Sequence, residues 1–358
     1  MSTPADERGQ FWVGGHYEDT PDLGPVRAGQ MYVEYQRPAS PSAPVPIVFV
    51  HGGGSTGVTF LRTPDGRPGW GPYFFSQGFA TYVVDRPGFG RSPMVPSVYG
   101  PSYQRVTVQD MQLRNTRAAE FKLWPQARLH TQWPGEGKPG DPIFDASLDG
   151  RGINGLEDVA MEQALARDAL SALLDLIGPA IVVSHSASGP IGFAIADKRP
   201  DAVRALVSLE PSGPPFHDVK QVGEDKPYEV GNVSRPWGLA AVPLTYDPPA
   251  ADPSELKFVE VDQSPSPELV RGWLQAEPAR RLPNLARVPI LILTGEASYH
   301  AAYDHATSNY LTQAGVAHDF VRLEDRGVHG NGHSMAIEKN NVEVAEVVRG
   351  WLERKVFS

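Results

Sequence analysis

The chain has 358 residues, of which 41% are hydrophobic, enough for one large α/β domain with insertions or for two smaller domains. Its net charge of -10 and its lack of a basic cluster argue against a nucleic-acid or anionic-membrane partner, because either would need a basic face. The absence of cysteine excludes disulfides, thiolate metal sites and a cysteine nucleophile.

The N-terminal stretch, MSTPADERGQFWVGG, has neither the basic region nor the apolar region of a secretory leader. No apolar run approaches the roughly 18 residues that a membrane-spanning helix needs. We therefore expect a cytoplasmic protein with no membrane partner, unless a leader was removed.

Short apolar strands alternate with helical patterns along the chain, which predicts a mostly parallel sheet with helices on both faces. The predicted strands are residues 30–36, 46–51, 80–85, 180–185, 205–210, 289–295 and 319–325. A helix is predicted over 157–177, where apolar residues recur at the helical period and Gly178 provides a left-handed stop.

A second helix is predicted from Ser334 to near the end of the chain. The apolar face that we expect to pack on the sheet consists of Ile337, Val344, Val347, Val348 and Trp351.

Two proline-rich segments with weak periodicity, residues 93–155 and 211–288, interrupt the alternation. Segments of this kind inside a compact fold are usually functional loops or lids. We predict a single α/β domain over residues 1–358, with both segments as cap insertions over a pocket. A plain surface excursion is the alternative for each.

A glycine-rich loop, HGGGSTG, follows the early strand predicted over 46–51. It matches the loop of lipases and esterases that presents a backbone N–H group to a developing oxyanion. Glycine suits this position because a Cβ atom would obstruct the approach of the substrate carbonyl. We predict the N–H groups of Gly53 and Ala187 as the oxyanion donors, with a non-catalytic glycine turn as the alternative.

A predicted strand ends in three serines and a histidine, in the stretch IVVSHSASGP. A serine nucleophile in an α/β sheet sits on a sharp strand-to-helix turn that tolerates only small residues two positions to either side. Ser184 fails this rule because of Val182, and Ser188 fails it because of Pro190. Ser186 has small residues on both sides, so it is the predicted nucleophile.

The acid of a serine triad usually lies a few residues past a late strand, here the one predicted over 289–295. In this chain Gly295 is followed by Glu296, and the aspartate of the common pattern is missing. Glu210 instead ends a predicted strand beside the nucleophile strand. Glu210 is therefore the predicted acid, with Glu296 and Asp304 as alternatives.

Two histidines, His329 and His333, lie in the loop after the last predicted strand. A base at this place follows the chain order of serine, acid and histidine. His333 is preferred because it directly precedes the predicted helix, after a Gly-Asn-Gly turn that can aim it at the sheet edge. His329 is the alternative.

Together with DRPGFGRS at 85–92, which looks like a D-x-x-G-x-G-x-S turn, these motifs resemble the α/β-hydrolase superfamily over nearly the whole chain. More narrowly, FWVGG, QMYVEY, HGGGSTGVTF, SHSASG, LEPSGPP and GNGHSM are similar to the esterase 713-like group of bacterial carboxylesterases. Because the triad acid of that group is a glutamate after the sixth strand, the resemblance implies triad roles for Ser186, Glu210 and His333. It also suggests a homodimer. The type member of the group has cysteines in the oxyanion loop where this chain has glycines, a change that backbone donors should tolerate.

The expected function is a carboxylesterase-type serine hydrolase that cleaves a small-molecule ester through an acyl-enzyme, with no metal and no organic cofactor. The alternatives are a lactonase, an amidase or an acyltransferase on the same triad, or a non-catalytic hydrolase fold that binds a small molecule. His51 and His185 adjoin the predicted site but lack the spacing of paired zinc ligands. Substrate contacts are predicted for His185, Gly54, Trp124 and Trp237.

Overall fold

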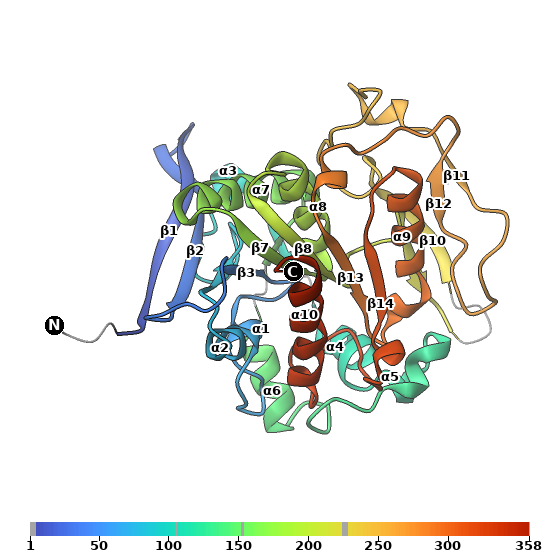
Figure 1. Ribbon diagram of the computed structural model, residues 1–358, viewed down its shortest axis with the longest axis horizontal. Helices are drawn as coiled ribbons and strands as arrows, with labels where there is room; N and C mark the ends of the chain where they lie inside the picture. The colour runs from blue at the N-terminus through green and yellow to red at the C-terminus, as the bar shows by residue number, and fades with distance from the viewer. Residues whose placement is uncertain (1–4, 105, 152–153, 224–227, 358) are drawn as a thin grey trace.

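The computed structural model describes residues 5–104, 106–151, 154–223 and 228–357. Its centre is an eight-stranded sheet (Figure 1). The strands, in their order across the sheet, are β1 (Glu7–Thr20), β2 (Gly24–Arg37), β4 (Thr81–Asp85), β3 (Ile47–Val50), β7 (Ala180–His185), β8 (Val203–Leu209), β13 (Ile290–Thr294) and β14 (Asp319–Arg322). Neighbours from β4 to β14 pair in parallel, while β1, β2 and β4 pair antiparallel at one edge. The predicted fold class is therefore confirmed.

Each predicted strand corresponds to an observed one, but the sequence reasoning missed β1. This strand pairs only with β2, at the edge of the sheet, and most of its side chains are exposed. Only Phe11 and Val13 pack against the core, and both are partly buried, so the strand shows too little apolar alternation to be identified from sequence.

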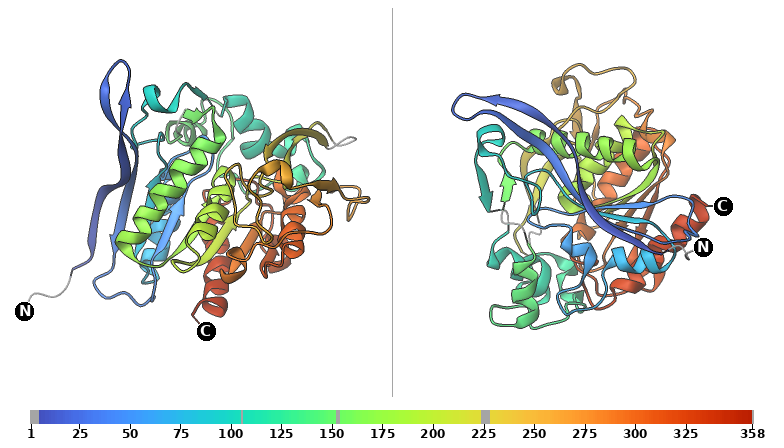
Figure 2. Two further views of the ribbon diagram at one scale, coloured as in Figure 1. Left: turned by 90° about the horizontal axis from the view of Figure 1, so that it is seen from above. Right: turned by 90° about the vertical axis from the view of Figure 1, so that its left-hand side faces the viewer.

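Strand side chains point alternately to two cores, one on each face of the sheet. In β3, Val48 and Val50 belong to one apolar cluster, while Ile47 and Phe49 belong to the other. The helices that cover the first face are α7 (Val159–Ile177), α8 (Gly189–Lys198) and α9 (Asp304–Gln313). Those on the second face are α2 (Trp70–Ser76) and α10 (Asn341–Lys355) (Figure 2).

The predicted helix over 157–177 is present as α7, and it is followed by Gly178 at a φ of +83°. The prediction for the last helix is wrong at its start, since residues 334–340 form turns and α10 begins at Asn341. The buried carboxylate of Glu338 accepts hydrogen bonds from Gly332 N–H and Asn331 Nδ2. These bonds fold the segment back on itself, so the helix starts only after it.

The two proline-rich segments fold into small elements. Residues 93–155 include α3 (Pro96–Tyr99), β5 (Ser102–Gln104), α4 (Val108–Met111), α5 (Ala118–Phe121), α6 (Pro142–Asp149) and the start of β6 (Asn154–Leu156). Residues 211–288 contain the strand pairs β9 (Phe216–Gln221) with β10 (Tyr228–Arg235), and β11 (Phe258–Glu260) with β12 (Trp273–Gln275). In Figure 1, α4, α5 and α6 lie along the lower edge, while β10 to β12 lie at the right. A further short helix, α1 (Val58–Leu61), follows the glycine loop.

Among the described residues, no helix combines the length and the apolar character needed to cross a bilayer.

Candidate active site

The turn between β7 and α8 presents the side chain of Ser186. The backbone of this residue has a φ of +56°, a left-handed conformation that is unusual for a residue with a side chain. Strain of this kind marks the sharp strand-to-helix turn that exposes a nucleophile at the edge of a sheet. Ser186 Oγ lies 2.9 Å from His333 Nε2.

The two flanking serines serve the structure instead. Ser184 and Ser188 are fully buried. Ser188 Oγ donates to the carbonyl of Val50 at 2.8 Å and accepts from the N–H group of His185 at 2.8 Å, which ties the turn to β3. Of the three serines, only Ser186 borders a cavity described below.

Gly189 allows α8 to begin close to the chain that leaves β8. A Cβ atom at this position would lie 2.4 Å from Pro211 Cβ and 2.5 Å from Pro211 Cα, and the second of these is backbone that cannot easily move. The absence of a side chain here therefore lets the Ser186 turn pack directly against Pro211.

We expect Gly189→Ala to lower the free energy of unfolding by about 1–3 kcal/mol, because the added methyl group overpacks a closed contact. Urea denaturation would measure the change. Gly350→Ala is the matched control, since that glycine lies within α10 and its nearest neighbour is the flexible end of Arg354, at 3.3 Å. This control should be neutral or stabilising by up to about 1 kcal/mol. Equal effects of the two changes would contradict the packing argument.

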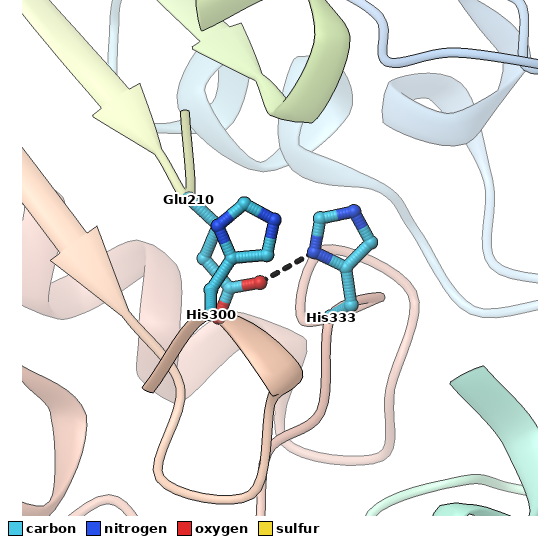
Figure 3. A group of neighbouring side chains, drawn as sticks. All are labelled: Glu210, His300 and His333. Carbon is cyan, nitrogen blue, oxygen red and sulfur yellow. Dashed lines mark hydrogen bonds and ion pairs between the residues drawn. The ribbon is translucent and has the colours of Figure 1, made fainter. Parts of the chain in front are cut away.

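Glu210 follows β8 directly and is fully buried, with a φ of +46°. Its Oε2 lies 2.5 Å from His333 Nδ1 (Figure 3) and accepts from Ser298 Oγ at 2.7 Å. Its Oε1 accepts from the N–H group of Gly295 at 2.8 Å. An unbroken chain of hydrogen bonds thus runs from Ser186 through His333 to Glu210.

Burial is the main cause of the pKa shifts of His333 and Glu210. It lowers the pKa of His333 well below the ordinary histidine value, and the neighbouring His185 and His300 add to the effect. Burial and the nearby Asp304 raise the pKa of Glu210, while the donors from Gly295 and Ser298 oppose that shift. The His333 ring is therefore neutral at neutral pH, the form that can accept a proton.

The alternative acids, Glu296 and Asp304, and the alternative base, His329, lie outside the hydrogen-bond chain from Ser186 to Glu210. Glu296 pairs with His329, at 3.2 Å, and the His329 side chain is 62% exposed. Asp304 pairs instead with His300 Nδ1, at 3.0 Å, and accepts from Thr294 Oγ1 at 2.7 Å. Among the described residues, Glu210 is the carboxylate that contacts His333.

Aromatic rings hold the His333 imidazole in place. The His300 ring stacks on it with planes 4° apart and centroids 4.7 Å apart. The rings of His185 and Tyr299 have centroids 4.6 Å and 4.7 Å away. His185 Nε2 also lies 2.9 Å from the backbone oxygen of His333, so His185 supports the loop that carries His333.

A cavity of about 210 Å³ opens beside Ser186 and His333. The predicted oxyanion residues Gly53 and Ala187 line it, as does His185. The first insertion contributes Val106, Asp110, Arg114, Asn115 and Arg151. In the part of the chain that the structure describes, no residue of 211–288 lines this cavity, so the two insertions differ in their relation to the site.

The structure does not support three of the predicted substrate contacts. Gly54 lies behind the cavity wall, where a Cβ atom would be 2.3 Å from Val106 Cγ2. Trp124 is fully buried, with its indole N–H group bonded to the carbonyl of Ala297, and Trp237 packs in the main core. Both tryptophans fill apolar interior space, which is the commoner use of a large aromatic side chain.

Sequence reasoning missed Tyr299, Arg114 and Arg151, which also line the cavity. No sequence pattern pointed to them. Both arginines come from the first proline-rich insertion, where Arg114 lies in a short π-helical turn (Gln112–Thr116), and Tyr299 begins a short 3-10 helix (Tyr299–Ala302) after β13.

One group among the described residues brings enough donor atoms together for a metal ion, namely Glu210, His300 and His333 (Figure 3). Their ligand atoms lie within 4.8 Å of one another. A metal there would displace the proton between Glu210 and His333, so the group can serve as a triad or as a metal site but not as both.

The sequence profile of the family described as alpha/beta hydrolase fold matches residues 45–235, more than half of the chain. The chain belongs to this family. This α/β hydrolase is 41% identical over 348 residues to a protein of Fungal sp. (strain ATCC 74256) named probable secreted lipase phiG, and the match covers 96% of this chain and 89% of the relative. It also shares its fold with a solved structure described as a novel bacterial esterase, with a TM-score of 0.65, 24% identity and coverage of 98% and 96% of the two chains.

These comparisons confirm the predicted α/β-hydrolase superfamily and its fold. They contradict the predicted cytoplasmic location, because the 41% identical relative is named a secreted lipase. That prediction rested only on the missing leader pattern in the first residues.

Proposed function

We propose that this α/β hydrolase is a carboxylesterase-type serine hydrolase with Ser186 as nucleophile, His333 as general base and Glu210 as the acid of the triad. The observation that carries the proposal is the hydrogen-bond chain of 2.9 Å and 2.5 Å that joins the three side chains beside a cavity. The relative named a lipase favours an ester as the substrate, and its name also supports secretion.

In the first half of the reaction, neutral His333 takes the proton of Ser186 as Oγ attacks the ester carbonyl. The N–H groups of Gly53 and Ala187 stabilise the negative charge that develops on the carbonyl oxygen. Protonated His333 then gives its proton to the leaving alcohol, which departs and leaves the acyl group on Ser186. In the second half, water attacks with His333 again as base, and the acid product is released.

Glu210 holds the imidazole in the tautomer with hydrogen on Nδ1 and stabilises the imidazolium that forms during attack. Its own position is fixed by Gly295 N–H and Ser298 Oγ. We further propose residues 93–155 as the cap of the site, because this insertion lines the cavity. The cavity volume of about 210 Å³ suits a small ester, since pockets that hold drug-sized ligands measure roughly 300–1,000 Å³.

Labelling with a fluorophosphonate tests whether the site is catalytic or only binds a ligand. We expect one probe per chain, attached at Ser186, because only an activated serine attacks the phosphorus atom. Intact-mass measurement followed by peptide mapping would show both the stoichiometry and the site. A properly folded chain that stays unlabelled would contradict the proposed function and favour a binding protein.

The pH dependence of kcat/KM should reflect the buried environment of His333. Because burial lowers the pKa of this base, it stays neutral down through the usual histidine range near 6.5. Activity on a short p-nitrophenyl ester should therefore be constant around neutral pH and fall only when the pH drops through that lowered pKa. His329→Ala should leave the profile unchanged, because that side chain is exposed and pairs with Glu296. A midpoint at or above 6.5, with folding intact by circular dichroism, would contradict this expectation.

A further inference from the structure

Two cationic side chains of the first insertion, Arg114 and Arg151, line the cavity that contains Ser186. Neither forms an ion pair with a carboxylate among the described residues. Arg151 Nε is buried and has no hydrogen-bond partner there. Arg114 lies over the ring of Tyr299, with its guanidinium carbon 5.6 Å from the ring centroid.

Both arginines are half-buried, and a cation that loses part of its hydration without gaining a counter-charge is costly. Burial lowers the pKa of Arg151 to about 10, so the side chain is still charged at neutral pH. The charges of Arg114 and Arg151 both reach the His333 ring, where they contribute to its lowered pKa. The positive charge is therefore placed where the reacting part of a ligand would lie.

The acidic groups near the cavity offset this positive charge only in part. Asp110 lines the cavity, but its Oδ2 accepts hydrogen bonds from the hydroxyl and N–H groups of Thr107. Glu210 lies behind His333, with hydrogen bonds to that ring and to its own backbone and serine donors. The wall of this cavity thus carries two cations, Arg114 and Arg151, and one anion, Asp110, which leaves an excess of positive charge.

Arg151 also borders a second, larger cavity of about 590 Å³. The two cavities share Thr59, Arg151 and Ile337 in their walls, and most of the larger one is apolar. Arg151 therefore stands at the junction of the cavity that contains Ser186 and a larger, more apolar cavity. A guanidinium at such a junction is suited to fix a charged group of a small ligand by a paired hydrogen bond.

We propose that the substrate of this hydrolase is an ester that carries a carboxylate group, bound by Arg151 with Arg114 adding to the positive field. This inference rests on the proposed ester hydrolysis at Ser186 and names the class of ester. A guanidinium fork matches the oxygens of a carboxylate or a phosphate, and the small cavity beside Ser186 favours the smaller and less charged carboxylate.

The test compares mono-p-nitrophenyl adipate, which carries a free carboxylate, with its methyl ester, in which a methyl group removes that charge, after subtraction of spontaneous hydrolysis. In the wild-type protein we expect kcat/KM to be about tenfold to a hundredfold higher for the anionic ester, the range of a hydrogen bond to a charged group. Arg151→Gln should bring this ratio close to one, and Arg114→Gln should lower it in part. Arg117→Gln is the control: it lies in the same insertion, but its side chain pairs with Glu120 and does not line the cavity. It should leave the ratio unchanged.

A second measurement needs only the wild-type protein. Free adipate should inhibit hydrolysis of the methyl ester competitively, and added salt should weaken the inhibition. Equal rates on the two esters, or a ratio that Arg151→Gln does not move, would overturn the inference. So would stronger inhibition by inorganic phosphate than by adipate. In each of these cases the neutral ester is still hydrolysed, whereas failure of the proposed function would leave both esters intact and Ser186 unlabelled.

Discussion

Ser186→Ala is expected to abolish ester hydrolysis, with kcat falling on the order of a millionfold. The substitution removes the atom that attacks the carbonyl, and neither of the two neighbouring serines is placed to replace it. Ser184 and Ser188 are fully buried, and Ser188 Oγ is held by Val50 and His185. Hydrolysis of p-nitrophenyl acetate by the purified variant would measure the loss.

The control for this prediction is Ser184→Ala rather than a change at Ser188. Ser184 lies inside β7, and its Oγ has no hydrogen-bond partner among the described residues, so its removal breaks no bond there. Ser184→Ala should keep most of the activity. A comparable loss in Ser184→Ala, with the fold intact, would move the nucleophile away from Ser186.

The parts of the site that lie at strand ends could be predicted from sequence. Ser186 was identifiable because a strand-to-helix turn restricts its neighbours to small residues, a local rule that leaves a trace in the sequence. Glu210 was identifiable because the usual place after β13 holds Glu296, which in the structure faces His329. Both arguments start from the ends of strands, which apolar runs reveal.

The walls of the cavity could not be predicted in this way. Arg114 and Arg151 come from a proline-rich insertion whose path depends on tertiary packing and not on any period. The same uncertainty led to Trp124 and Trp237 being placed in the pocket, although both fill apolar interior space. Aromatic content alone does not tell whether a side chain faces a ligand or the core.

Glu210→Gln is expected to lower kcat by roughly 10⁴ without unfolding the protein. The geometry explains why an amide of nearly the same shape should be so harmful. Oε1 accepts a hydrogen bond from the N–H group of Gly295, so the amide oxygen of glutamine must take that position. Its NH₂ group then falls where Oε2 lies, facing His333 Nδ1.

An NH₂ donor at that position requires Nδ1 of His333 to be an acceptor, so the ring proton moves to Nε2. Nε2 lies 2.9 Å from Ser186 Oγ, and once protonated it cannot take the hydroxyl proton. The variant should also keep its stability, because it removes a fully buried carboxylate and adds no volume. Kinetics, thermal unfolding and the ¹⁵N shifts of the His333 ring would together separate a tautomer effect from misfolding.

Glu296→Gln is the matched control, because Glu296 contacts His329 and the N–H group of Gly330 and lies off the hydrogen-bond chain. It should retain near-wild-type kcat. The reverse pattern, with Glu210→Gln active and Glu296→Gln inactive, would place the acid after β13. A Glu210→Gln variant that is inactive but keeps the wild-type ring tautomer would show instead that Glu210 acts by stabilising the imidazolium charge, because an amide can orient the ring but cannot supply a counter-charge.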